Sequence, residues 1–214
     1  MTIRTAALFI LLPFATQAGP GAVDWITTHT QQPLKEARIG SYDPDGPIIG
    51  VDSLTYEPSY SWPYIDVPDG PADFHVFYDD ETGRVSKAAL IFSDADPSCG
   101  KDLATMPVDT GTGAFLDRKA AEALDRIATE TGDLYGGFME PQIDGTHSFA
   151  KFLKLPGGHV FPAFQTGWGD GGYPVASLRG SDGAMVAIYA DFMGKDADGN
   201  WLLPTPCAPT EGSE

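Results

Sequence analysis

The sequence predicts a mainly β protein of the α+β class, an antiparallel sheet or sandwich with one clear helix. Short runs rich in β-branched and aromatic residues recur along the chain, and tight turns of Asp, Asn and Gly separate them. Only one segment repeats apolar residues at helical spacing over three or more turns. Because most connections between the expected strands are short, antiparallel pairing is favoured over parallel pairing.

The first half of the chain is expected to begin with a short helix over 23–31, which buries Trp25 and Ile26 ahead of Pro33. A loop-rich stretch and the turn 43–47 then lead into a strand over 48–54. Strands over 74–78 and 85–92 form a hairpin around the turn 79–83, which ends in a left-handed glycine. The segment 101–106 is expected to form a short turn of helix.

The second half contains the clearest helix. Asp117 is expected to cap the helix 118–131, because an aspartate side chain can accept the N–H groups of a first helical turn. Gly132 ends this helix. Further strands are expected, with glycine-containing turns between them, over 148–155, 160–165, 173–178, 185–192 and 201–203.

Residues 1–18 have the pattern of a secretory signal peptide. A basic start precedes the apolar run 6–15, and small residues follow it up to Ala18. The run is shorter than the roughly 20 residues that a membrane-spanning helix needs. We therefore expect cleavage after Ala18, no stable membrane anchor, and a periplasmic or secreted protein. The mature chain is expected to be one globular β-rich domain over 19–204, followed by a flexible tail over 205–214.

The chain contains two cysteines, Cys99 and Cys207. In an exported protein an isolated pair usually forms a disulfide, which here would attach the tail to the body of the domain. The alternative is two unpaired thiols. Neither cysteine has a nearby histidine or basic cluster that would make it a reactive thiolate.

The chain is strongly acidic, with 30 Asp and Glu residues against 13 Lys and Arg residues. A net charge of -17 argues against nucleic-acid binding, which needs clustered basic residues. The same charge argues against binding to an anionic membrane. A protein or a cation is the partner that this composition favours.

An aromatic and proline-rich stretch follows the first expected strand. It either lines a ligand groove or packs on the core as an ordinary loop. Its aromatic residues are Tyr56, Tyr60, Trp62 and Tyr64.

Two glycine-rich segments, 107–117 and 167–174, contain the candidate binding residues. Glycine lets the backbone approach another group closely, and the aspartates can accept hydrogen bonds or hold a cation. In the second segment, Asp170 either braces a strained turn or belongs to a loop shaped around a ligand. The candidates in these segments are Asp109, Thr110, Gly111, Asp117, Trp168, Gly169, Asp170 and Tyr173.

The two segments resemble those of a bacterial family of uncharacterised proteins, the domain-of-unknown-function 4241 family. A VDxGxGxFxD pattern is matched by Val108, Asp109, Gly111, Gly113, Phe115 and Asp117. A later SGxGDGxYPV pattern is matched by Gly167, Gly169, Asp170, Gly171, Tyr173, Pro174 and Val175, with Thr166 in place of the serine and Gly172 as an insertion. A closing strand ends in Asp191-Phe192. The resemblance implies a β-rich fold and no particular activity, and it suggests that Asp109, Asp117, Asp170 and Asp191 belong together.

Two functions fit these observations. The first is an exported, non-catalytic binding or interaction domain, since the sequence shows no set of nucleophile, base and orienting residue. The alternative is a carboxylate-based hydrolase, with or without a metal, in which Asp109, Asp117 and Asp170 act as acid, base or oxygen ligands. His147 or His159 could join them. Calcium is the only cofactor that this alternative suggests.

Overall fold

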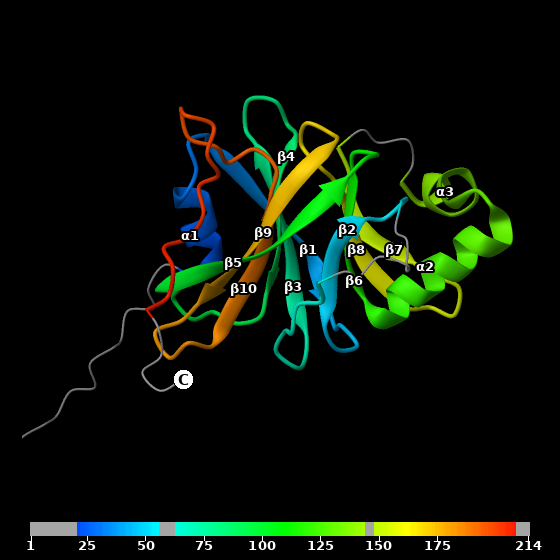
Figure 1. Cartoon of the computed structure of the whole chain (residues 1–214), viewed down its shortest axis with the longest axis horizontal. Helices are drawn as coiled ribbons and strands as arrows, with labels where there is room; N and C mark the ends of the chain where they lie inside the picture. Colours follow the sequence, from blue (N-terminus) through cyan, green and yellow to red (C-terminus); the bar gives the residue numbers. More distant parts are fainter. Residues whose placement is uncertain (1–20, 56–62, 144–147, 209–214) are drawn as a thin grey trace, which may run out of the picture.

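Two antiparallel sheets packed face to face form the body of the protein in a computed structural model that describes residues 21–55, 63–143 and 148–208 (Figure 1). The mainly β, α+β prediction is therefore confirmed. In order across the larger sheet, the strands are β1 (Leu34–Tyr42), β3 (Ala72–Asp79), β4 (Val85–Ile91), β10 (Met185–Asp191), β9 (Gly171–Arg179) and β5 (Cys99–Val108). Across the smaller sheet they are β2 (Ile48–Asp52), β6 (Thr112–Asp117), β8 (Val160–Gln165) and β7 (Ala150–Lys154).

The main core lies between the sheets. Phe74 of β3 packs against Phe164 of β8, with ring centroids 6.1 Å apart, and Phe115 of β6 lies 5.2 Å from the same Phe164 ring. Successive side chains of a strand point to opposite faces of its sheet. His75 and Phe77, the alternate residues of β3, therefore face the outer side of the larger sheet.

Helices cover the two outer faces, so the layers run helix, sheet, sheet, helix (Figure 1). On the larger sheet, α1 (Ala22–Thr28) buries Ile26 in a cluster with Phe77 and Tyr189. The smaller sheet is covered by α2 (Arg118–Thr131), the π-helical turn η1 (Tyr135–Met139) and α3 (Glu140–Ile143). Each outer cluster lets its sheet bury a second apolar face.

The elements with strong local signals lie where the sequence predicts them. The hairpin β3–β4 turns at Gly83, which has a φ of 67°. The Asp117 side chain accepts the Ala120 N–H at 2.8 Å at the start of α2, and Gly132 ends the helix in the left-handed conformation. These capping contacts are local, so they can be read from neighbouring residues.

Three expectations for secondary structure are wrong. The segment 101–106 is the middle of β5, because its backbone pairs with β9. Residues 34–42 were expected to lie in the loop-rich stretch that follows the first helix. They form β1, which pairs with β3 along its length. The segment 201–203 makes one isolated bridge, between Lys195 and Trp201, in place of a strand. Pairing with distant residues decides all three outcomes.

Cys99 and Cys207 form the expected disulfide across a sequence separation of 108 residues. Beside it, the Gly100 N–H donates to the Thr205 carbonyl at 2.8 Å, and the Cys207 N–H donates to the Gly100 carbonyl at 3.2 Å. Residues 205–207 were assigned to a flexible tail, but these bonds place them along the start of β5. Within the described ranges, no helix is both long and apolar enough to span a bilayer.

At Gly100, β5 packs tightly against β9 and the C-terminal segment. A methyl group there would overlap the Ser177 carbonyl oxygen and the Pro204 ring. We predict that Gly100→Ala lowers the free energy of unfolding by about 1–3 kcal/mol, the usual cost of overpacking a filled site. Gly137→Ala is the matched control, since a methyl group there meets open space. Urea unfolding measures both variants, and a Gly100→Ala protein as stable as the wild type would contradict this packing.

Candidate functional site

The two glycine-rich segments meet where the chain crosses between the sheets. Residues 109–111 connect β5 to β6, and residues 166–170 connect β8 to β9. The Thr166 N–H donates to the Gly111 carbonyl at 2.9 Å. Gly111 has a φ of 71°, and a Cβ atom there would lie 3.3 Å from Gly169 Cα. The two crossovers therefore pack backbone to backbone, and we call residues 109–111 and 166–170 the paired-loop surface.

The second crossover is held by hydroxyl groups and an arginine. Thr166 Oγ1 and the Tyr173 hydroxyl donate to the Gly169 carbonyl at 2.7 and 2.8 Å, and Arg84 Nη1 donates to the Gly167 carbonyl at 2.9 Å. The Asp170 side chain is exposed and makes no hydrogen bond to any described residue. The interpretation that Asp170 braces this turn is therefore wrong, and its carboxylate faces solvent.

The first crossover is held by Asp52, the last residue of β2, which sequence reasoning missed. Its carboxylate is 3% exposed and accepts the Asp109 and Thr110 N–H groups at 2.8 and 2.7 Å. The Thr110 hydroxyl donates to the same carboxylate at 2.8 Å, and the Leu54 N–H at 2.8 Å. The available signal was an aspartate within the expected strand 48–54. The Asp52 carboxylate, and not that of Asp109, holds this crossover, and the Asp109 side chain is exposed.

Trp168 is the most exposed large apolar residue of the described chain, with 61% of its surface accessible. The Arg84 guanidinium carbon lies 4.4 Å from the centroid of the Trp168 ring, a cation–π contact that holds the indole in place. Sequence reasoning missed Arg84, which follows the β3–β4 turn. The paired-loop surface thus presents a fixed aromatic ring on one crossover and an exposed carboxylate on each, those of Asp109 and Asp170.

Asp117 lies at the opposite end of β6 from this surface. Its buried carboxylate caps α2 and also accepts the Asp45 N–H at 3.0 Å and the Tyr42 hydroxyl at 3.1 Å. His159 Nε2 lies 2.9 Å from the same carboxylate. Burial, and next the Asp117 charge, raise the pKa of Tyr42 far above its ordinary value. Asp117 therefore joins three chain segments, the start of α2, residues 42–45 and the turn at His159, and does not reach the paired-loop surface.

Asp191 ends β10 and faces the outer side of the larger sheet. It accepts a hydrogen bond from Lys87 Nζ at 2.7 Å, and both side chains are almost completely buried. The Gly194 N–H donates to the other carboxylate oxygen at 2.7 Å. The suggestion that the four aspartates of the resemblance share one site is wrong, because Asp117 and Asp191 are used within the fold.

The metal-assisted hypothesis required Asp109, Asp117 and Asp170 to converge, and they do not. Over the described ranges, no group of three His, Cys, Asp or Glu side chains could hold a metal ion. His147 and the aromatic residues Tyr56, Tyr60 and Trp62 lie outside the described residues. Tyr64, the last of that aromatic stretch, has the Arg118 guanidinium carbon 4.3 Å from its ring centroid.

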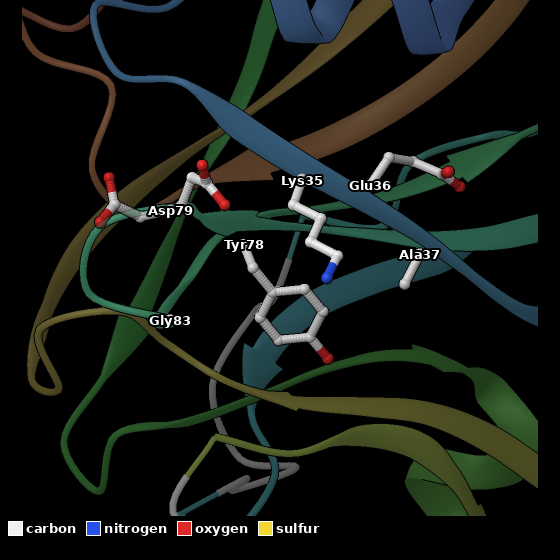
Figure 2. Close-up of a pocket in the computed structure, with 7 residues that line it drawn as sticks. Lys35, Glu36, Ala37, Tyr78, Asp79 and Gly83 are labelled. Carbon is white, nitrogen blue, oxygen red and sulfur yellow. The ribbon is translucent and has the colours of Figure 1, made fainter.

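A cavity of about 360 Å³ lies beside the β3–β4 turn that carries Arg84 (Figure 2). The Lys35 and Tyr78 side chains extend toward each other across it, while Glu36 points in another direction. Burial raises the pKa of Tyr78. Lys35 and the carboxylates of Asp79 and Asp80 line the same space, so the cavity favours neither sign of ligand charge.

The fold and the site define the class of protein: a mainly β protein of two packed sheets, in which two hydrogen-bonded loops that cross between the sheets form an exposed surface. The chain belongs to the family described as protein of unknown function (DUF4241), whose model matches residues 75–190, more than half of the chain. The expected resemblance is thereby confirmed, and the matched span contains both glycine-rich segments. Comparisons with curated proteins and with solved structures found no match.

The bracing role of Asp52 can be tested against the free carboxylate of Asp109. In Asp52→Asn an amide NH₂ replaces one acceptor oxygen and faces N–H donors. We expect the free energy of unfolding to fall by about 3 kcal/mol, since hydrogen bonds to a buried charge are costly to lose. Asp109→Asn should change it by no more than about 0.5 kcal/mol, as is usual for an exposed position. Equal effects of the two substitutions in urea unfolding would contradict the assignment.

Proposed function

We propose that this protein is an exported, non-catalytic binding domain that holds a protein partner on the paired-loop surface. The observation that carries the proposal is Trp168, which stays 61% exposed on a crossover whose backbone is held by Arg84, Thr166 and Tyr173. Rigid aromatic side chains are frequent anchors of protein interfaces. A loop already fixed in shape loses little further entropy when a partner binds.

The charge around Trp168 supports a basic partner. Asp109 and Asp170 are exposed on the same two crossovers, and the whole chain has a net charge of -17. Such a field attracts positively charged surfaces and speeds their association at low ionic strength. Arg84 is already occupied by the Gly167 carbonyl and the Trp168 ring. The favoured partner therefore presents lysine or arginine around an apolar recess that accepts the indole.

Two observations support the exported location in this proposal. The leader-like pattern of residues 1–18 is typical of a secretory signal peptide. The disulfide between Cys99 and Cys207 is compatible with an oxidising compartment. A periplasmic or extracellular protein partner follows from the same proposal.

The test selects phage-displayed random peptides on the disulfide-bonded exported protein and measures their affinities by calorimetry. We expect the selected peptides to be rich in Lys and Arg and to bind more weakly as salt rises. Trp168→Ala should weaken binding by about 30-fold, since an aromatic hot spot contributes about 2 kcal/mol.

The matched control is Tyr135→Ala, which removes another exposed aromatic ring from the far helical layer. It should leave the peptide affinities unchanged. Peptides that bind Trp168→Ala as well as they bind the wild type, or a selection dominated by acidic peptides, would refute the proposal.

A further inference from the structure

Lys87 of β4 and Asp191 of β10 are charged side chains with almost no access to solvent. The two residues stand opposite each other in the register of the two central strands of the larger sheet. Lys87 Nζ lies 2.7 Å from Asp191 Oδ2, and the side chains are 0% and 2% exposed. The cost of taking two charges out of water can exceed the energy of their attraction. An arrangement that keeps the contacts of this pair and removes both charges is therefore favoured.

The hydrogen bonds around Asp191 distinguish its two carboxylate oxygens. Oδ1 accepts the Met193 and Gly194 N–H groups at 3.1 and 2.7 Å. Among the described residues, Oδ2 accepts a hydrogen bond from Lys87 alone. A methyl group at Gly194 would overlap the carboxylate, so glycine lets this backbone approach so closely. Oδ1 is thus held by the backbone, whereas Oδ2 has only Nζ as a partner.

Lys87 has more hydrogen-bond donors than its surroundings can accept. An ammonium group has three N–H donors, whereas the nitrogen of a secondary amide has one. Nζ donates to Asp191 and, at 3.2 Å, to the His29 carbonyl at the end of α1. No third oxygen of the described residues accepts from Nζ, which lies 5.5 Å from the centroid of the Tyr189 ring. These surroundings therefore match an amide nitrogen better than an ammonium group.

We propose that Lys87 and Asp191 condense into an isopeptide bond, an amide between two side chains that joins β4 to β10. One proton passes from Nζ to Oδ2, which gives an amine and a carboxylic acid. The Nζ lone pair then attacks Asp191 Cγ, and the N–H groups of residues 193 and 194 stabilise the negative charge that develops on Oδ1. A second proton passes from the nitrogen to Oδ2, the Cγ–Oδ2 bond breaks, and one water molecule leaves. The third proton stays on the amide nitrogen, so atoms and charge balance without another reactant.

The hydrogen bonds that now hold the ion pair would also hold the amide. Its N–H donates to the His29 carbonyl, and its oxygen keeps the two N–H groups that Oδ1 already accepts. The bond would connect residues 104 positions apart, beside a disulfide that connects residues 108 positions apart. Unlike the disulfide, an amide is not broken by thiols. The two central strands would therefore stay covalently joined whatever the redox state of the surroundings.

Peptide mass spectrometry of the folded wild-type protein tests the bond directly. The protein is reduced, alkylated at Cys99 and Cys207, and digested with trypsin, which does not cleave after a lysine whose amine has become an amide. We expect residues 85–101 and 180–195 to appear as one branched peptide in most molecules. Its mass should be lower than that of the two peptides together by one water molecule. Two separate peptides, with cleavage after Lys87, would overturn the proposal.

Variants show whether the lost water comes from this pair. Lys87→Arg keeps the positive charge but has no amine to react, so it should give the full unmodified mass. The matched control is Lys101→Arg, which changes an exposed lysine of the same tryptic peptide and should leave the branched peptide intact. A mass deficit of one water that persists in Lys87→Arg would place the reaction elsewhere and refute the bond. A thermal melt checks that Lys87→Arg folds, and if it does not, the digest of the wild-type protein decides.

This inference is independent of the proposed binding function. Trp168→Ala should form the isopeptide bond as fully as the wild type does, because Trp168 makes no contact with the pair in the described structure. Failure of the isopeptide bond and failure of the paired-loop proposal are therefore distinguishable.

Discussion

Buried carboxylates at the ends of strands hold this fold together. Asp52, Asp79, Asp117 and Asp191 are each the last residue of a strand, and none is more than 4% exposed. Each accepts at least one backbone N–H from the chain that follows it. A chain that leaves a sheet has backbone N–H groups without partners in the neighbouring strand. A buried carboxylate without hydrogen-bond donors is energetically costly. The N–H groups and the carboxylate therefore satisfy each other. These hydrogen bonds fix the direction in which the chain leaves each of the four strands.

The same residue type consequently has two separate uses. Asp117 and Asp191 are saturated with donors inside the fold, whereas Asp109 and Asp170 are exposed on the paired-loop surface. A carboxylate that already accepts several hydrogen bonds would have to give them up before it could act as a base or bind a cation. The exposed pair loses only water when a cation approaches. The proposed recognition therefore uses the two carboxylates that the backbone does not need.

Local signals in the sequence were sufficient for the hairpin β3–β4, for α2 and its cap, and for the pairing of the two cysteines. They were insufficient for β1 and β5, because the helix-compatible residues of 101–106 become a strand only through their register with β9. The glycine-rich segments stood out by composition. Their common brace did not, because the contact between Asp52 and Asp109 spans 57 residues of sequence. Free and bound aspartates look identical in a sequence, which is why Asp117 was grouped with Asp109.

The β3–β4 hairpin connects the paired-loop surface to the body of the fold. Arg84, at its turn, supports Trp168 through the cation–π contact. Beyond this turn the hairpin packs on the phenylalanine-rich core between the sheets, where close packing resists small displacements. Its neighbour β10 is fixed in turn by the buried pair of Lys87 and Asp191. A rigid connection of this kind keeps Arg84, and with it the Trp168 ring, at a fixed position on the fold, so the surface proposed for recognition loses little further entropy when a partner binds.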